Sequence, residues 1–379
     1  MAAPSSPPLS VIITSHDYER YLGDAIASAL DQRGAATEVI VVDDGSTDGS
    51  REVIESFGDR VTAIFQANAG QAVAQNRGYR ASSGGPVIFL DADDMLMPDA
   101  AANVLAALRD PQVAKVHWSM PVIDAEGRRT GEIQDPELAE GDLRRQFFEH
   151  GPLSDETMPS PPSSGNAYPR WYLDQVMPIP EDVYFRAPDE YLFGLAPAFG
   201  PIARIEPQSC YRVHDRNASL LRPFEKKLSF QREHWETMVR AGREAAARQG
   251  LVHDELVWER HAWWPRTARA VSAIEAAVPA GERLALIDQT LLGFEPELRG
   301  RTVIPFPEQD GEWAGNPADD ADAIVALERM RAASISYFAV AWPSFWWFEE
   351  YPGLARELRA GGRVLIDDED LLLVGPDGG

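Results

Sequence analysis

The sequence predicts an α/β fold, in which a mostly parallel sheet is flanked by helices, followed by a helical linker and a small C-terminal α/β domain. In the first half, short β-branched runs alternate with amphipathic helical stripes. Two of these runs end in acidic clusters. The 379 residues are enough for more than one domain, because a domain typically holds about 100–200 residues. We predict a disordered N-terminus over 1–8, a large α/β domain over 9–224, a helical linker over 225–280 and a small α/β domain over 281–379.

Four strands and four helices are predicted in the first hundred residues. The strands are short runs rich in Val, Ile, Leu and Phe at 11–13, 39–42, 61–65 and 87–90. Apolar stripes with helical spacing predict helices at 22–30, 53–57 and 72–81, and Pro98 opens a fourth. Strands that alternate with helices form a parallel sheet, and ligands of such sheets bind at the carboxyl ends of the strands.

Both acidic clusters lie at that edge of the predicted sheet. Asp43–Ser46 follows the second strand and Asp91–Asp94 follows the fourth. Carboxylates gathered in one crevice repel each other unless a cation or hydrogen-bond donors hold them. Mg²⁺ is usually bound by one or two carboxylates together with substrate phosphates. The chain has neither a G-x-G-x-x-G nor a G-x-x-x-x-G-K-[ST] loop, so a metal on aspartates is the remaining way to neutralise a bound pyrophosphate.

The composition excludes several classes of protein. With 35 Lys and Arg against 60 Asp and Glu, the net charge is 35 − 60 = −25, which argues against nucleic acid as a partner. A single cysteine excludes an intramolecular disulfide framework. The N-terminus lacks the features of a signal peptide, and the most apolar run, 335–348, is too short to span a membrane. We therefore expect a cytoplasmic protein with no membrane span.

Four segments, in this order and spacing, resemble the successive motifs of family 2 glycosyltransferases. These are Leu9–Leu22, Val39–Ser50, Asn68–Gly78 and Val87–Asp99, and the resemblance extends over about residues 9–220. It implies the GT-A fold and transfer of a sugar, with inversion, from a nucleotide diphosphate donor such as a UDP-, GDP- or dTDP-sugar. The acceptor would be a hydroxyl group of a saccharide or glycolipid, and the implied cofactor is Mg²⁺ or Mn²⁺.

The resemblance also implies roles for individual residues. Asp93, at the end of the D-x-D motif, would bind the metal, and His214 of the segment Y-R-x-H would complete that site. His16, Arg77 and His214 each have a plainer alternative, as a loop histidine, a surface arginine and a locally hydrogen-bonded histidine. The residues that would contact the nucleotide sugar are Thr14, His16, Asp44, Asn76, Arg77 and Asp91.

Inversion requires a general base, and a carboxylate is the usual choice for deprotonating an acceptor hydroxyl. In the family this residue lies at the head of a helix that ends in a glycine before the last core strand. Counting back from Gly200 places Asp189 there, directly after Pro188. Glu181 and Asp182 are the alternative pair, and Asp189 could also serve only as a favourable charge at a helix start.

The second half carries weaker signals. Residues 225–277 are expected to be helical, with their tryptophans in a core or an interdomain seam. Strands are expected at 302–304, 336–341 and 364–366, with 371–374 as a closing edge and 346–358 as one helix. This region resembles a Rossmann-like appendage of some bacterial glycosyltransferases, for which protein contacts or acceptor recognition are the better expectations. A nucleotidyltransferase is disfavoured because its basic, glycine-rich loop is missing after residue 14, whereas a catalytically degenerate nucleotide-sugar-binding or scaffolding module remains an alternative.

Overall fold

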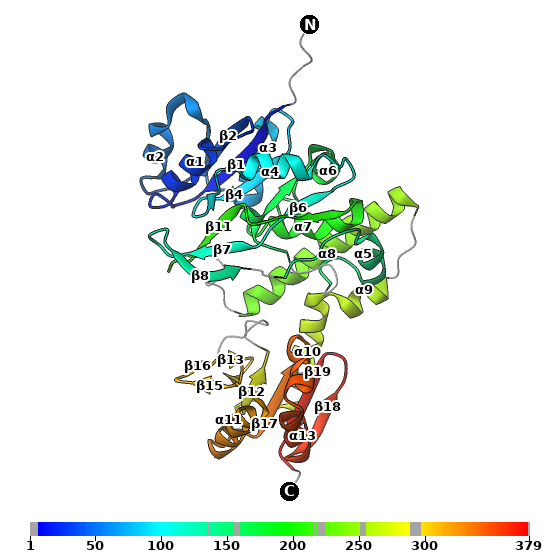
Figure 1. Ribbon diagram of the computed structural model, residues 1–379. Coiled ribbons are helices and arrows are strands. Elements are labelled where there is room, and N and C mark those ends of the chain that lie inside the picture. Colours follow the sequence, from blue (N-terminus) through cyan, green and yellow to red (C-terminus); the bar gives the residue numbers. More distant parts are fainter. Residues whose placement is uncertain are drawn as a thin grey trace. The chain divides into compact units, whose positions relative to one another are not determined.

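The computed structural model describes residues 7–134, 137–154, 160–215, 217, 224–250, 255–288 and 297–377. These residues fall into two compact units, each of which is described by itself (Figure 1). The first unit contains residues 1–221 and 233–262, and the second contains 222–232 and 263–379. The segment 225–280 that we expected as a separate helical linker is thus divided, with 233–262 in the first unit and with 225–232 and 263–280 in the second.

The first unit is built on a seven-stranded sheet in the order β10-β6-β9-β4-β1-β2-β3. Strands β1 to β4 are mutually parallel, whereas β9 runs antiparallel to both of its neighbours, β4 and β6. This mainly parallel sheet confirms the predicted α/β class. Its strands are β1 (Leu9–Ser15), β2 (Thr37–Asp44), β3 (Thr62–Gln66), β4 (Val87–Asp91), β6 (Lys115–His117), β9 (Asn166–Tyr168) and β10 (Ile202–Arg204).

A second sheet of four strands, in the order β5-β11-β7-β8, lies in the same unit. These strands are β5 (Met95–Leu96), β11 (Ser209–Arg212), β7 (Met120–Ile123) and β8 (Arg129–Gln134). The helices of the unit are α1 (Leu22–Leu30), α2 (Ser50–Ser56), η1 (Gly58–Arg60), α3 (Gln71–Ala81), α4 (Ala100–Ala107), α5 (Arg144–His150), η2 (Ser163–Gly165), α6 (Arg170–Val176), α7 (Asp189–Phe199), α8 (Phe224–Gln249) and α9 (Glu255–His261). Helix α8 begins in the second unit and continues into the first.

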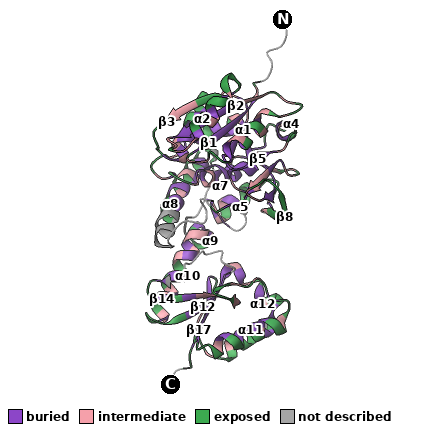
Figure 2. Ribbon diagram, turned by 90° about the vertical axis from the view of Figure 1, so that its left-hand side faces the viewer, coloured by how far each residue is buried: buried purple, intermediate pink, exposed green. Residues whose placement is uncertain are grey.

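Burial explains why the central strands read as continuous apolar runs. Strand β1 is buried along nearly its whole length, and so is the second half of β2, because helices cover both faces of the sheet. Figure 2 shows the buried residues along these strands and exposed residues on the outer helix α2. Trp118 is the largest side chain of this core, and its indole Nε1 donates to Ser209 Oγ at 2.8 Å, so the buried N–H has a partner.

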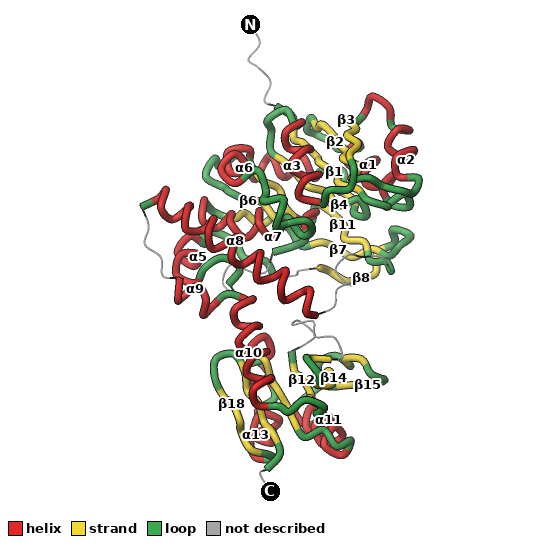
Figure 3. Tube along the Cα trace, turned by 180° about the vertical axis from the view of Figure 1, so that it is seen from behind, coloured by secondary structure: helices red, strands yellow, loops and turns green. Residues whose placement is uncertain are grey.

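The second unit has a six-stranded sheet in the order β13-β14-β12-β17-β19-β18 (Figure 3). Alternate residues of β12 pack on opposite faces: Leu284 and Leu286 lie in the core with α10, whereas Ala285 and Ile287 lie in the core with α11 and α13. The elements are α10 (Trp263–Ala277), β12 (Arg283–Ile287), β13 (Glu297–Leu298), β14 (Arg301–Pro305), β15 (Glu308–Gln309), β16 (Glu312–Trp313), α11 (Asp320–Ala332), β17 (Tyr337–Ala341), η4 (Trp342–Ser344), α12 (Trp347–Glu350), α13 (Pro352–Ala360), β18 (Arg363–Asp367) and β19 (Leu371–Gly375).

Three expectations for this unit need correction. Strand β19 is not the closing edge, because it inserts antiparallel between β17 and β18 and leaves β18 at the edge. Strand β12, in the middle of the sheet, was not predicted. The helix expected over 346–358 is two helices, which meet at Tyr351 and Pro352, because proline is well placed to open the second one.

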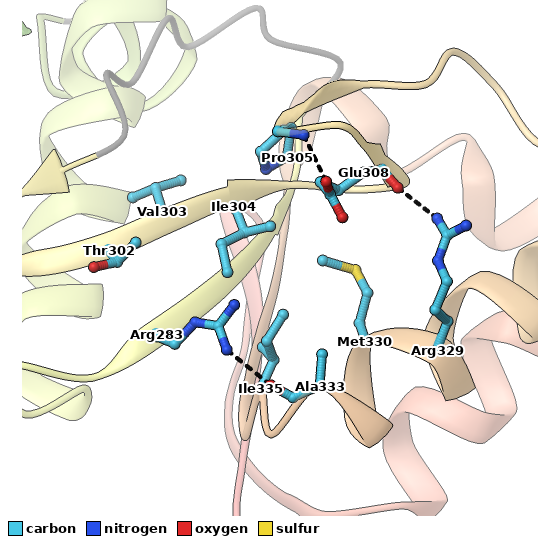
Figure 4. A pocket seen from close by; sticks show the side chains of 11 residues that line it. Arg283, Thr302, Val303, Ile304, Pro305, Glu308, Arg329, Met330, Ala333 and Ile335 are labelled. Carbon is cyan, nitrogen blue, oxygen red and sulfur yellow. Dashed lines mark hydrogen bonds between the residues drawn. The ribbon is translucent and has the colours of Figure 1, made fainter.

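A hollow of about 290 Å³ lies in the second unit beside β14, α11 and the β15–β16 hairpin (Figure 4). Arginines stand on its walls, and each donates to a backbone carbonyl. Arg283 Nη1 donates to the oxygen of Ala333 at 2.8 Å, and Arg329 Nη2 donates to the oxygen of Glu308. These two cations therefore brace the walls of the hollow.

The described helices include none that is both long enough and apolar enough to span a bilayer.

A prediction about stability concerns the turn that follows β2. Gly45 has φ 75°, and a Cβ added there would lie 2.5 Å from the backbone nitrogen of Asn68. We expect Gly45→Ala to lower the free energy of unfolding by at least about 1–3 kcal/mol, since a left-handed residue is strained and backbone atoms cannot move aside. Gly58→Ala is the matched control, because Gly58 has φ 55° with nothing within 4 Å of the added Cβ. Equal shifts in melting temperature for both variants would contradict the prediction.

Candidate active site

The predicted site residues from three strands lie at one edge of the large sheet. Strands β1 and β4 are in register such that Thr14 pairs with Asp91. On the other side of β1, Ser15 pairs with Asp43, one residue before Asp44. Because β1, β2 and β4 are parallel, their carboxyl ends meet here, as the sequence predicted.

Asp44 organises the loop after β3. Its buried carboxylate accepts hydrogen bonds from Gln66 Nε2 at 2.6 Å, from the Ala69 nitrogen at 2.8 Å and from the Gly70 nitrogen at 2.8 Å. His16 lies beside it, with Nδ1 3.0 Å from the Asp44 carbonyl oxygen and a side chain that is 43% exposed. The structure thus brings His16 and Asp44 together, with the imidazole accessible for stacking.

The two predicted residues of α3 face different surroundings. The side chain of Asn76 is buried and donates to the Ile179 oxygen at 2.9 Å and to Glu181 Oε1 at 3.0 Å, while its own oxygen accepts from the Ile179 nitrogen. Asn76 therefore anchors the segment before α7. Arg77 is exposed, and its guanidinium makes no hydrogen bond or ion pair with another described residue. Glu181, one member of the alternative base pair, is held by Asn76, and its neighbour Asp182 is exposed.

Asp91 begins the acidic loop after β4. Its Oδ1 accepts from Gln71 Nε2 at 3.1 Å, and its backbone nitrogen donates to Ser164 Oγ at 3.0 Å. Burial, and then the charges of neighbouring carboxylates, raise the pKa of Asp91 well above its usual range. The neighbours responsible are Asp94, Asp93 and Asp189.

Asp93 and His214 form a close pair. His214 Nε2 lies 3.0 Å from Asp93 Oδ2, and the ring of Tyr21 stacks on the imidazole at 4.6 Å between centroids. Two ligands at right angles about an octahedral ion are separated by about 3.0 Å when each lies about 2.1 Å from the ion. The spacing of this oxygen and nitrogen therefore fits two neighbouring positions of a Mg²⁺ or Mn²⁺ ion. Among the described residues, three or more metal-binding side chains do not gather at one point, so an ion held here would need further ligands from elsewhere.

Arg212 is a residue of the site whose role was missed. Its guanidinium is 1% exposed and donates through Nε to the Asp93 carbonyl oxygen at 2.7 Å and through Nη2 to Asp24 Oδ2 at 3.1 Å. Its backbone nitrogen donates to Asp94 Oδ1 at 2.9 Å, and its guanidinium lies over the Tyr21 ring. Arg212 thus fixes the acidic loop after β4 and joins it to α1. Its only signal in the sequence was its position in the Y-R-x-H segment.

Asp189 is the first residue of α7, which begins after Pro188 and ends before Gly200, as predicted. Burial, and then the charge of Glu190, raise the pKa of Asp189 to about 7. Its charge in turn contributes to the raised pKa of Asp91, so the two carboxyl groups share one polar region. A carboxyl group with a pKa near neutrality is well matched to accept a proton from a hydroxyl group.

Residues 10–170 match the sequence profile of Glycosyl transferase family 2. An uncharacterized glycosyltransferase of Nostoc sp. is 35% identical over 216 residues, which are 55% of this chain and 66% of that protein. A putative teichuronic acid biosynthesis glycosyltransferase of Bacillus subtilis is 37% identical over 112 residues, 28% of this chain and 44% of that protein. The match with this chain thus spans 66% and 44% of the length of these two curated relatives, less than two thirds in each case.

Among solved structures, S. aureus TarS in complex with UDP is similar with a TM-score of 0.49 and 16% identity, over 96% of this chain and 95% of that one. The profile match covers strands β1 to β4, the acidic loop and β9. Residues 10–170, which include strands β1 to β4, β6 and β9 of the first compact unit, are therefore a glycosyl transferase family 2 segment.

Proposed function

We propose that this chain is an inverting glycosyltransferase, which transfers a sugar from a nucleotide diphosphate donor to a hydroxyl group of a saccharide or glycolipid. The observation that carries this proposal is the position of Asp189 at the head of α7, close enough to the acidic loop to raise the pKa of Asp91. A proton acceptor and a diphosphate site must lie on either side of the anomeric carbon for inversion to occur.

The donor would lie along the carboxyl ends of β1, β2 and β4. His16 and Asp44 border the space for the base, and Asp44 is already oriented by three donors. Thr14 and Asp91 are neighbours in the register and are suited to the ribose. Arg77 would supply positive charge to the diphosphate. Asn76 would act indirectly, because its amide is engaged with the segment at 179–181.

Asp93 and His214 would hold Mg²⁺ or Mn²⁺ at the diphosphate. When bound, this ion would neutralise the charge that develops on the departing nucleoside diphosphate. The net charge of −25 makes a cation the more necessary, since an acidic protein otherwise repels an anionic donor. Arg212 keeps the backbone of Asp93 in place, which would leave the Asp93 carboxylate available to hold the ion.

In the transfer step Asp189 would take the proton of the acceptor hydroxyl. That oxygen forms a bond to the anomeric carbon as the bond from this carbon to the diphosphate oxygen breaks, so the configuration inverts. The donor is a UDP-, GDP- or dTDP-sugar, and the reaction would take place in the cytoplasm. A degenerate binding module would bind the same nucleotides without turning them over, so turnover separates the two functions.

The first prediction tests the proposed base. We expect Asp189→Asn to lower the transfer rate by roughly 10²–10⁴-fold while UDP, GDP or dTDP still raises the melting temperature, because the amide cannot accept the proton. Asp182→Asn is the matched control, since this exposed residue belongs to the alternative pair. A large loss in Asp182→Asn with normal rates in Asp189→Asn would reverse the assignment.

The second prediction concerns the metal. We expect Asp93→Ala to weaken Mn²⁺-dependent binding of nucleoside diphosphate by at least about 10–100-fold, the loss usual even for residues one layer beyond the ligands. Isothermal titration with UDP, GDP and dTDP, with Mn²⁺ and with EDTA, measures this effect. Asp99→Ala is the control, because its side chain is exposed and does not cap α4. Equal binding in EDTA and in Mn²⁺ would refute the metal site.

The third prediction concerns pH. Because a general base must be ionised, and because the pKa of Asp189 is raised to about 7, we expect kcat/KM to rise as pH increases through about 7. Below that pH the rate should fall roughly tenfold per unit, since only the ionised fraction can accept the proton. The residual activity of Asp189→Asn should lack this acidic limb. If kcat/KM of Asp189→Asn still fell at low pH in the same way, the titrating group would be a residue other than Asp189.

A further inference from the structure

A buried histidine of α8 is paired with the residue next to the proposed base. His234 Nδ1 lies 2.6 Å from Glu190 Oε2, and the imidazole is 1% exposed, whereas the Glu190 side chain is 33% exposed. The ring of Tyr184 packs against the imidazole with centroids 4.0 Å apart, and the Tyr184 hydroxyl donates to the His234 carbonyl oxygen at 3.4 Å. The histidine therefore has one orientation, which points its Nδ1 at Glu190.

Glu190 matters to the base because the two carboxyl groups are adjacent in the first turn of α7. Both begin the helix directly after Pro188, so the position of one side chain constrains the backbone of the other. The negative charge of Glu190 also disfavours ionisation of Asp189, as like charges do at short range. Any group that partly cancels the charge of Glu190 makes Asp189 easier to ionise.

We infer that His234 is a positioning residue for the proposed base: through Glu190 it fixes the first turn of α7 and reduces the negative potential at Asp189. This inference rests on the proposed function. A carboxylate only accepts hydrogen bonds, so Nδ1 must carry the hydrogen whether the ring is neutral or charged. In both cases the positive end of the N–H bond faces Glu190.

Other groups share this environment. Strand β4 contributes Asp91 and β9 contributes Tyr168, both of which interact electrostatically with Asp189. The segment before α7 contributes Tyr184, and Tyr191 follows on α7 itself. Helix α8 contributes Arg240, whose charge acts on both of these tyrosines. His234 differs from all of these groups in its hydrogen bond to Glu190.

The test uses three variants of the full chain and the pH profile of kcat/KM. Nucleotide-sugar turnover is measured with UDP-, GDP- and dTDP-glucose and Mn²⁺. We expect His234→Ala to move the acidic limb upward by about 0.5–1 pH unit, and Glu190→Gln to move it downward, since a nearby charge shifts a carboxyl pKa by about that amount or more. His234→Asn, whose amide nitrogen can replace Nδ1 as donor, should restore most of the wild-type profile.

A purely structural role gives a different pattern. If His234→Ala lowers kcat without moving the limb, or if Glu190→Gln moves it in the same direction as His234→Ala, the inference is wrong. Melting temperatures of the variants show whether each has folded. An unchanged limb in Asp189→Asn would instead remove the proposed base, so the two failures are distinguishable.

A second measurement needs no turnover. In protein labelled with ¹⁵N-histidine, two-bond ¹H–¹⁵N correlations report which ring nitrogen carries hydrogen, and His234→Asn identifies the signal among the seven histidines. We expect Nδ1 of His234 to be protonated in the wild type, and this preference to weaken in Glu190→Gln. An Nδ1 without hydrogen in the wild type would overturn the pairing.

Discussion

Mutual repulsion among carboxylates is the constraint around which the edge of the large sheet is arranged. Asp91, Asp93, Asp94 and Asp189 lie in one partly buried region, and burial together with their neighbours' charges raises the pKa of Asp91 and Asp94. Two like charges 4 Å apart repel by about 4 kcal/mol at an effective dielectric constant of 20, so such a cluster would destabilise the fold unless donors met it. In the structure, Arg212 donates hydrogen bonds to this acidic loop and brings a positive charge beside it. In the proposed function, a divalent cation would offset the repulsion further.

The donors that stabilise this edge come from distant parts of the chain. Arg212 enters from β11 and joins the backbone of Asp93 to the carboxylate of Asp24 on α1. Gln71, from the start of α3, donates to Asp91. Both sets of contacts join segments that are far apart in the sequence, so they hold the acidic loop in this shape only within the folded first unit.

The local sequence pattern was sufficient to predict many of the helices and strands. It was insufficient where a strand's place depends on pairing with a segment far away in the sequence. Strands β1 to β4 and the bounds of α7 followed from apolar periodicity, Pro188 and Gly200, whereas the two-residue strand β5 was missed. Strand β9 could not be predicted, because three residues carry no periodicity and its place between β4 and β6 depends on segments far away in the sequence. The predicted order of β18 and β19 in the sheet was wrong for the same reason. The contacts of Arg212 and His234 were invisible because they join residues 119 and 44 positions apart.

In the proposed function, the nucleoside and the acceptor proton are handled by different stretches of this chain. The residues proposed for the base and the ribose all precede residue 100, whereas Asp189 and the proposed metal-site residue His214 follow the family match, which ends at residue 170. Asn76 joins the two stretches, because its buried amide binds both the backbone of Ile179 and the side chain of Glu181. On this proposal, substitutions around Asp189 would change the rate of reaction without removing the contacts proposed for the nucleoside. The amide side chain of Asn76 thus fixes the segment at 179–181, which leads into α7, against helix α3.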